Sequence, residues 1–440
     1  MFQVGMYKQD LADALTGDNI PAQERIEAIA LCLQDGARTA VWIALDFMDF
    51  DHGVIFALRS AIAEKTGIAY EHVHVVTTHN HGGGEPALPR LAQLCAACAW
   101  QAQQALRPAR MRYTFVKGDR KMNYIRRKYV PELDRTITIF YGASHKDGFD
   151  AAPFAEQAVQ TTRSGQLRYV GRTETDRPAD PFDDADDEIF LLQFCGLDGT
   201  PIGSVLRFAA HAVCSNVAGY FSSDYPWHGR RVLEEKFGGT ALFFNGPCGD
   251  ISPDMEQKGD GSQIRLGEYL ANTALQALEE ESFAEVSAFE DATVPVALPT
   301  RKEVLAGWVE LPEKMPEDLP SRRRWLEREY LGKFMSFLRE KAAENGSVPE
   351  RVTIELGMLK LNGLTVVGFP GETFSATAQQ VKAVFPNREI CTVTEHDRTV
   401  MYVPPVEEAA RGGYESVCMT TAPGAEDTLR ESAIRAIEQF

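Results

Sequence analysis

The stretch HVHVVTTHNHGGG, residues 72–84, carries the pattern of a buried strand directly into two histidines and three glycines. Side chains alternate between the two faces of an extended chain. If residues 73–81 stay extended, His79 and His81 therefore point the same way. The glycines that follow would permit a sharp turn and leave the two imidazoles room for a metal or a ligand. His72 and His74 have the opposite parity, and we expect them to be structural or surface residues.

Apolar runs bounded by turn residues alternate with helical patterns along the 440 residues. This alternation predicts a single α/β domain over residues 1–440, with a mixed β-sheet core flanked by helices. The expected strands lie at 39–46, 72–78, 135–141, 188–194, 201–211, 240–245 and 364–370. The expected helices lie at 53–66, 89–106, 226–237, 263–281, 321–344, 373–384 and 426–439.

Composition excludes several classes of protein. The chain starts without an apolar signal region and has no run of roughly 20 apolar residues, so we expect a cytoplasmic protein without integral membrane association. A net charge of −18 disfavours nucleic-acid binding. Eight cysteines in so long a chain indicate reduced thiols, and the CxxC of Cys95 and Cys98 lies in an apolar helical run typical of core packing. Composition leaves open whether the chain forms homo-oligomers.

Two segments look like additions to this core. Residues 173–188 are acidic and contain prolines, but they lack the EF-hand pattern, so we expect a solvated surface loop. Residues 298–346 are charged and helical, with an aromatic and apolar stripe. That segment is either an amphipathic helical insertion that covers core or a lid over a pocket.

Residues with useful chemistry follow several of the predicted strands. His211 ends one strand, Ser252 lies in a glycine-containing loop after another, and Glu372 comes just after VVGFPG. Ligand sites in α/β sheets form outside the carboxyl ends of strands, so these residues could meet the HxH pair. Two neutral histidines and a glutamate form a known catalytic zinc set that leaves a position open for water. The chain has no GxSxG nucleophile elbow.

Several of these blocks resemble a known family. TTHNHGGG, RFAAHAVCSN, FFNGPCGDISPD, VVGFPGETFSA and MYVPPVEEAARGGYE resemble, in that order, signature blocks of the neutral/alkaline ceramidase family's amino-terminal catalytic domain. The resemblance runs from about residue 41 to the C-terminal segment. It leaves no room for the carboxy-terminal immunoglobulin-like domain of the members that cleave lipids.

The resemblance implies a zinc-dependent amidase, because members of the family hydrolyse the N-acyl bond of ceramide. His79, His211 and Glu372 would bind Zn²⁺, and Tyr402 is the best match for a further ligand. His81 would be a second active-site histidine that stabilises the developing oxyanion. Ser252 matches the family's essential serine, which is either a nucleophile or a group that positions water.

The substrate-binding residues are predicted from two places. Arg126 and Arg127, in NYIRRKY, resemble the family's substrate-binding arginine block. The loop FFNGPCGDISPD has the composition of a tight turn that presents backbone N–H groups, and it adds Asn245, Gly249 and Asp250 to the predicted set.

The chain also departs from the family pattern. Gly82 and Gly83 replace the serine and proline that usually follow HxH, and Asn80 stands where threonine is usual. With the negative charge and the missing signal peptide, these departures favour a soluble small-molecule amide over ceramide. Two alternatives stay open: a metal-dependent esterase, lactonase or phosphoesterase on the same site, and a metal-binding module that has lost activity with the contacts at Gly82 and Gly83.

Overall fold

The computed structural model describes most of the chain, and the following account concerns those residues. They are residues 1–15, 24–36, 38–119, 122–130, 135–138, 159–161, 167–169, 185–215, 221–253, 261–301 and 349–440. Most of the predicted acidic loop at 173–188 and of the charged insertion at 298–346, with its helix at 321–344, lies outside the described residues.

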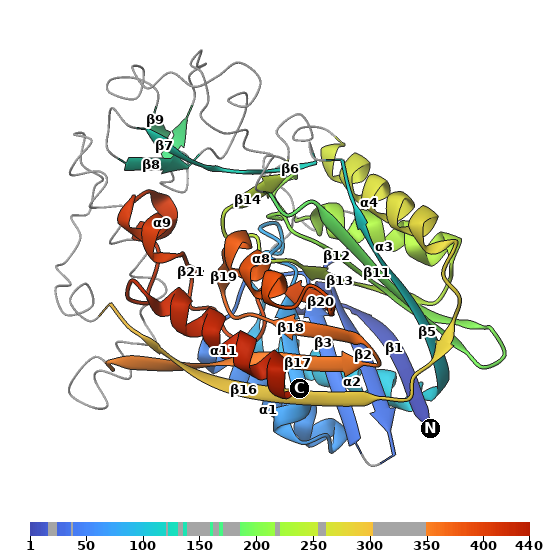
Figure 1. Cartoon of the computed structure of the whole chain (residues 1–440). Coiled ribbons are helices and arrows are strands. Elements are labelled where there is room, and N and C mark those ends of the chain that lie inside the picture. The colour runs from blue at the N-terminus through green and yellow to red at the C-terminus, as the bar shows by residue number, and fades with distance from the viewer. Residues whose placement is uncertain are drawn as a thin grey trace.

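A nine-stranded mixed sheet forms the larger part of the core (Figure 1). One half contains β1 (Phe2–Asp10), β2 (Glu27–Asp35), β3 (Arg38–Leu45) and β4 (Val73–Thr77). The other contains β5 (Arg107–Lys117), β11 (Glu188–Gly196), β12 (Pro201–Phe208), β13 (Thr240–Asn245) and the short β15 (Ala284–Glu285). Only two residue pairs between β1 and β5 join the halves, and β13 packs back against β2, β3 and β4. The carboxyl ends of β4, β12 and β13 can therefore meet.

A second sheet packs against the first. It contains β16 (Phe289–Pro299), β17 (Arg351–Leu361), β18 (Leu364–Gly368) and β20 (Glu389–Val393). Four short ladders lie outside the two sheets: β6 (Asn123–Ile125) with β14 (Ile251–Pro253), β19 (Glu372–Thr373) with β21 (Tyr402–Val403), β7 (Arg127–Val130) with β8 (Arg135–Thr138), and β9 (Val159–Thr161) with β10 (Leu167–Tyr169).

Helices cover the outer faces of both sheets. Apolar contacts pack α1 (His52–Thr66) and α2 (Leu88–Gln104) on β2 and β3, and α3 (Asp224–Lys236) and α4 (Ser262–Leu278) on β11 to β13. The outer face of the second sheet packs against α8 (Ser375–Val384) and α11 (Ala425–Gln439), and Figure 1 shows α11 lying across this sheet. The short α9 (Val406–Ala410) and α10 (Tyr414–Val417) follow β21.

Strand β2 shows why the core strands are apolar at every position. Ile29, Leu31 and Leu33 pack toward the second sheet, whereas the alternate side chains pack under α1 and α2. Both faces of the strand are buried, so the two-residue period separates two apolar layers instead of core from water.

Local signals set the ends of α1. The Asp51 side chain accepts a hydrogen bond from the Val54 N–H at 2.9 Å, which caps the amino terminus, and Gly67 ends the helix with a φ of 73°.

The predicted α/β class is confirmed. Five of the seven predicted strands, at 39–46, 72–78, 188–194, 240–245 and 364–370, correspond to β3, β4, β11, β13 and β18 with ends within two residues. The strand predicted at 201–211 ends earlier, at Phe208, and that at 135–141 is described only as far as Thr138. All eight cysteines are free and buried, as predicted. Among the described residues, no helix is long and apolar enough to cross a membrane.

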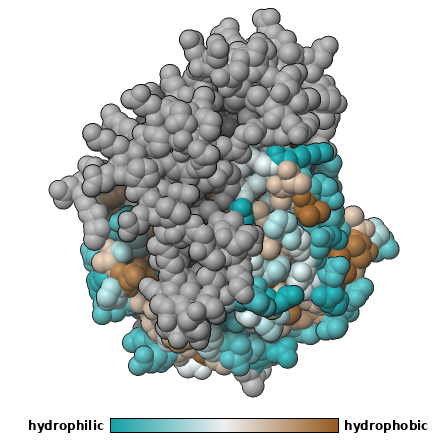
Figure 2. All heavy atoms as spheres, turned by 90° about the vertical axis from the view of Figure 1, so that its left-hand side faces the viewer, coloured by the Kyte–Doolittle hydropathy of each residue, from teal (hydrophilic) through white to brown (hydrophobic). Residues whose placement is uncertain are grey.

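The described surface is mainly polar on the face that Figure 2 presents, where hydrophobic residues form separate small patches. Large apolar side chains that are exposed come from distant parts of the chain: Met1, Tyr7, Phe56, Leu88, Leu197, Ile264, Val384 and Val406. Single exposed apolar residues are normal on a folded protein, so these carry no functional argument.

Candidate metal centre

The histidine pair lies in a turn and not in a strand. β4 ends at Thr77, and His79 has a left-handed φ of 55°. The condition that residues 73–81 stay extended is therefore not met. The imidazoles converge all the same, with 3.3 Å between the Nε2 atoms of His79 and His81. A positive φ at a residue other than glycine costs free energy, and such residues cluster at functional sites.

His211 approaches from the end of β12. Its Nδ1 lies 2.9 Å from the carbonyl oxygen of Ile251, so Nδ1 carries the proton and Nε2 presents its lone pair. That Nε2 faces the Glu372 carboxylate at 3.1 Å. A lone pair and a carboxylate oxygen repel each other, so the arrangement needs a proton or a cation between or beside them.

Glu372 faces two of the histidines. Its Oε2 lies 3.4 Å from Nε2 of His79 as well as 3.1 Å from Nε2 of His211. In the β19–β21 ladder, Glu372 pairs with Tyr402, which brings the tyrosine beside the carboxylate. The Tyr402 hydroxyl accepts a hydrogen bond from Nη2 of Arg126 at 2.9 Å.

The three histidines form a group with metal-ligand geometry. His79, His81 and His211 each offer a ring nitrogen, and these nitrogens lie within 4.8 Å of one another. His79 and His211 are each 1% exposed, whereas His81 is half-buried and is the member of the group that solvent or a substrate can reach. Imidazole nitrogens with one carboxylate are donors that suit Zn²⁺.

The electrostatics of the site favour a cation. Burial opposes protonation of His79, but the carboxylates of Glu372, Glu395 and Asp49 outweigh it and raise the pKa of His79 to about 9. Burial, with the neighbouring positive charges, lowers the pKa of His211 to about 3 and that of His81 well below its usual value. Two neutral imidazoles thus lie beside a cluster of acids.

Two of those acids were absent from the sequence-based prediction. Glu395 is 2% exposed, and its Oε1 lies 3.3 Å from Nδ1 of His79, where the carbonyl oxygen of Met48 is also 3.2 Å away. Asp49 is half-buried, and burial raises its pKa to about 6. Each follows a strand, Glu395 after β20 and Asp49 after β3, and that position at a strand's carboxyl end could have identified both.

Comparison with solved structures identifies the fold. No family model matches the chain, and no curated protein matches it. Neutral ceramidase from Pseudomonas aeruginosa superposes with a TM-score of 0.66 at 16% identity, over 100% of this chain and 75% of that one. A ceramidase complexed with C2 gives 0.67 at 16% identity, over 100% and 76% of the two chains. The chain has the neutral ceramidase fold. The resemblance predicted from the sequence blocks is confirmed at this level.

Gly82 and Gly83, which follow the HxH pair, lie directly against the backbone of other segments. A Cβ atom on Gly82 would lie 2.6 Å from the backbone oxygen of Ser222, and one on Gly83 would lie 2.4 Å from that of Asp46. Protein backbone thus occupies the space that side chains at these two positions would need, and whether the imidazoles have room for a ligand stays a prediction. The absent side chains of the two glycines are a packing requirement, which argues against the reading of Gly82 and Gly83 as lost functional contacts.

The predicted substrate-binding loop contacts the segments that carry the site residues. The Asn245 amide bonds backbone groups of Thr78 and Ala210. Gly249 lets the loop approach Glu372, since a Cβ there would lie 2.4 Å from the Glu372 backbone oxygen. The carboxylate of Asp250 accepts hydrogen bonds from the backbone N–H and hydroxyl of Ser375, the first residue of α8. The polar side chains of Asn245 and Asp250 thus make internal contacts, and their role in binding substrate stays a prediction.

The two predicted substrate-binding arginines are buried in ion pairs. Arg127 donates to the carboxylates of Glu408 and Glu415 and to the backbone oxygens of Glu408 and Gly412. Arg126 donates through Nε to Glu415 and through Nη2 to Tyr402 and to the backbone oxygen of Gly249. Arg127 therefore anchors the segment after β21, and Arg126 lies beside a predicted ligand.

Ser252 lies next to the contact that orients His211. It is 1% exposed in β14, directly after Ile251, whose carbonyl oxygen faces both the backbone N–H and Nδ1 of His211. The ladder between β14 and β6 pairs Ser252 with Tyr124.

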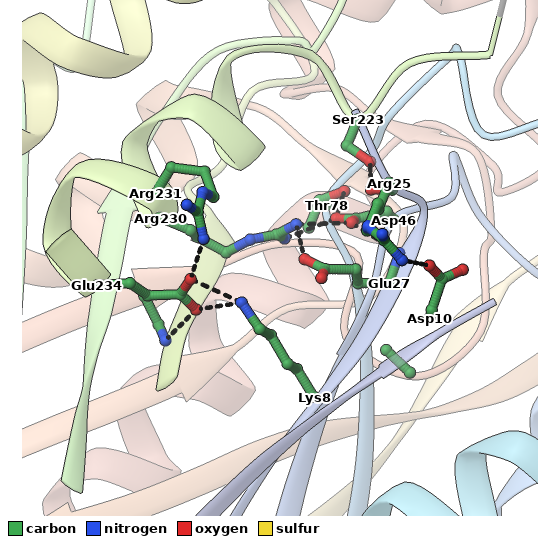
Figure 3. A network of polar contacts seen from close by, with 12 residues as sticks. Lys8, Asp10, Arg25, Glu27, Asp46, Thr78, Ser223, Arg230, Arg231 and Glu234 are labelled. Atoms are coloured by element: carbon green, nitrogen blue, oxygen red, sulfur yellow. Dashed lines mark hydrogen bonds and ion pairs between the residues drawn. The ribbon is translucent and has the colours of Figure 1, made fainter. Parts of the chain in front are cut away.

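A buried ion-pair network supports the histidine turn (Figure 3). Arg230 on α3 donates to both carboxylate oxygens of Asp46 at 2.7 Å and to Glu27 at 3.2 Å. Asp46 in turn accepts the Thr78 hydroxyl at 3.4 Å, and its backbone oxygen accepts the Asn80 side-chain amide at 3.2 Å. The network thus contacts the residues on both sides of His79.

Proposed function

We propose that this chain is a zinc-dependent hydrolase that cleaves an amide bond, of the N-acyl type, in a soluble small molecule. The observation that carries the proposal is the convergence of three imidazoles and the Glu372 carboxylate at the carboxyl ends of strands from both sheets. The likeness in fold to neutral ceramidases supports amide hydrolysis as the reaction.

The metal would be held by His79, His211 and Glu372, with Tyr402 as a fourth donor. Nε2 of both histidines faces the carboxylate; on His211 it presents a lone pair, and on His79 a bound dication would take the place of the proton, so the donor set fits a dication. Bound Zn²⁺ supplies Lewis-acid polarisation of the scissile carbonyl and lowers the pKa of a water molecule. Arg126 keeps the Tyr402 hydroxyl in place through the 2.9 Å hydrogen bond.

His81 is the residue best placed to face the substrate. Its ring is the half-buried one of the three, and its low pKa keeps it neutral near pH 7. A neutral imidazole can donate one N–H to the oxygen on which negative charge develops. Ser252, beside the segment that orients His211, would supply a hydroxyl as nucleophile or to position the attacking water.

Metal analysis and a substrate panel test the proposal together. We expect about one zinc ion per chain of purified protein and hydrolysis of at least one member of a panel of soluble N-acyl amides. His79→Ala should remove both. His72→Ala is the matched control, because His72 lies just before β4 and contacts Asp291 instead of the site.

Two outcomes would overturn the proposal. One is metal-free protein whose amidase activity survives His79→Ala. The other is full zinc occupancy with no turnover of any amide, which would leave a binding module. Matched amide and ester substrates decide the bond: faster cleavage of the esters would replace the amidase by an esterase that uses the same residues.

A further inference from the structure

We infer that Asn245 is a positioning residue: its side chain fixes the backbone next to the proposed metal ligands His79 and His211. This inference rests on the proposed function, because it concerns the same metal centre. Asn245 is the last residue of β13 and is fully buried. Its side chain bonds backbone groups of Thr78 and Ala210, so its effect passes through the backbone.

The side chain of Asn245 bridges two chain segments. Nδ2 donates to the carbonyl oxygen of Thr78 at 3.2 Å and to that of Ala210 at 3.0 Å. Oδ1 accepts from the backbone N–H of Ala210 at 3.3 Å. Because the amide faces two carbonyls on one side and an N–H on the other, its orientation follows from its partners.

The bonded residues immediately precede two predicted metal ligands. Thr78 comes before His79, and Ala210 comes before His211. The backbone oxygen of Asn245 also accepts the N–H of Thr394 at 2.8 Å, and Thr394 comes before Glu395, which faces Nδ1 of His79. One residue therefore ties three segments that follow β4, β12 and β20.

A second connection on the far side of the histidines completes the arrangement. The backbone N–H of His81 donates to the carbonyl oxygen of Ala212 at 3.3 Å, and Asn80 and Ala212 form an isolated bridge. The His79 and His211 segments are thus joined both before and after their imidazoles. Without the Asn245 side chain, the later connection is the one direct hydrogen-bonded link between these two segments among the described residues, so we expect the separation of the Nε2 atoms to be less well fixed.

Only an amide side chain supplies this set of bonds. Two N–H donors on one atom are needed for two carbonyls, and an acceptor is needed beside them for the N–H of Ala210. Aspartate has no donor when ionised, and a hydroxyl has one. Metal sites need their ligands held within about 0.5 Å of the binding geometry, so the loss should appear in metal affinity as well as in stability.

The test compares Asn245→Ala with a control asparagine that has a similar structural role elsewhere. Asn362 lies in the turn between β17 and β18 and bonds the backbone of Glu285, Ser287 and Ala288. We expect Asn245→Ala to raise the zinc dissociation constant by roughly 10-fold or more, whereas Asn362→Ala should change it by no more than about 2-fold. Competition with a chromophoric chelator gives the constant, and the d–d absorption of the Co²⁺ form reports ligand geometry.

The side-chain link from Asn245 to Thr78 and Ala210 is called the clamp below. Amide hydrogen exchange tests the clamp without any metal. In Asn245→Ala, exchange should rise together in the peptides around Thr78 and Ala210, which lose the side-chain contacts, whereas Thr394, which bonds the Asn245 backbone, should keep its protection. Asn362→Ala should leave all these peptides unchanged. If Asn245→Ala does not fold, Asn245→Asp keeps the side-chain volume, removes the donors and serves in its place.

The outcomes separate this inference from the proposed function. An unchanged zinc constant and Co²⁺ spectrum in a folded variant overturn the inference while the metal site stands. Wild-type protein that binds no zinc overturns the proposed function, and hydrogen exchange then decides the clamp alone. Exchange that rises only around residue 245 overturns the clamp in either case.

Discussion

Gly83→Ala is the substitution that most directly tests the packing of the histidine turn. A Cβ atom at this position would lie 2.4 Å from the carbonyl oxygen of Asp46 and 3.0 Å from the Phe47 ring. The oxygen belongs to backbone and cannot rotate away, so either the turn or the end of β3 must move. Overpacking of this kind costs about 1–3 kcal/mol. The lower entropy of the unfolded chain returns about 0.4–1 kcal/mol, so we expect a net loss of about 1–2 kcal/mol.

The same displacement should reach the metal site. Asp46 holds the Asn80 amide through its backbone oxygen and Arg230 through its carboxylate, so moving it shifts the residue between His79 and His81. Zinc affinity should therefore fall in parallel with stability. Equilibrium unfolding in urea gives the free energy, and chelator competition gives the affinity.

Gly363→Ala is the control for Gly83→Ala. A Cβ there would meet only the Glu389 carboxylate at 3.9 Å, and its φ is not left-handed. This variant should be unchanged or slightly more stable. If Gly83→Ala is as stable as Gly363→Ala and loses only turnover, the packing argument is refuted and Gly83 is a substrate contact.

The remaining predictions concern single side chains. His79→Ala should lose zinc, whereas His81→Ala should keep the metal stoichiometry and lose turnover; zinc lost from both would make His81 a ligand. Glu395→Gln, which replaces the carboxyl group beside Nδ1 of His79 by an amide, should weaken zinc binding by roughly 10-fold, and an unchanged constant in chelator competition would exclude a supporting role. Asp291→Asn should cost about 2 kcal/mol of unfolding free energy at pH 7. The reason is that interactions with His74 and His72 outweigh burial and hold the pKa of Asp291 at about 2. Since this folded-state pKa is depressed, the difference from wild type in urea unfolding should persist above about pH 4 and vanish as the pH falls through about 2; a difference independent of pH would contradict it.

The sequence predicted the strands whose apolar character is unbroken and missed those whose pattern is ambiguous. TAVWIALD and TALFFN are short apolar runs between turn residues, and they form β3 and β13. EAIALCLQD forms β2, but alanines on one face and larger residues on the other give a run that also suits a buried helix. β16 and β17 are long and partly polar, because their outer positions reach solvent.

Site residues were predictable where the chemistry itself marks them. His79, His81, His211 and Glu372 combine metal-binding side chains with positions after strands, and the structure brings them together. The backbone conformation that brings them together was not predictable. A left-handed residue at His79 cannot be read from a strand pattern, since it depends on hydrogen bonds of the turn to β3.

Asn245 and Asp250 show the limit of reading function from turn composition. Asparagine, aspartate and glycine are typical of loops that bind ligands, and also of loops that satisfy buried backbone groups. In this chain the second use applies: Asn245 bonds Thr78 and Ala210, and Asp250 bonds Ser375. Sequence gives the same signal for both, because the difference lies in which segment the fold places opposite the loop.

The charge balance of the site explains why these supports and the proposed metal belong together. Glu372, Glu395 and Asp49 all act on the single imidazole of His79, and burying that many carboxyl groups is costly without a compensating cation. A proton on His79 supplies one positive charge, whereas a dication would supply two and satisfy the lone pairs on Nε2 of both buried histidines. A ligand that binds only the folded chain adds to its stability. The acids, the left-handed turn and the Asn245 contacts therefore form a frame whose free-energy cost a bound metal would offset.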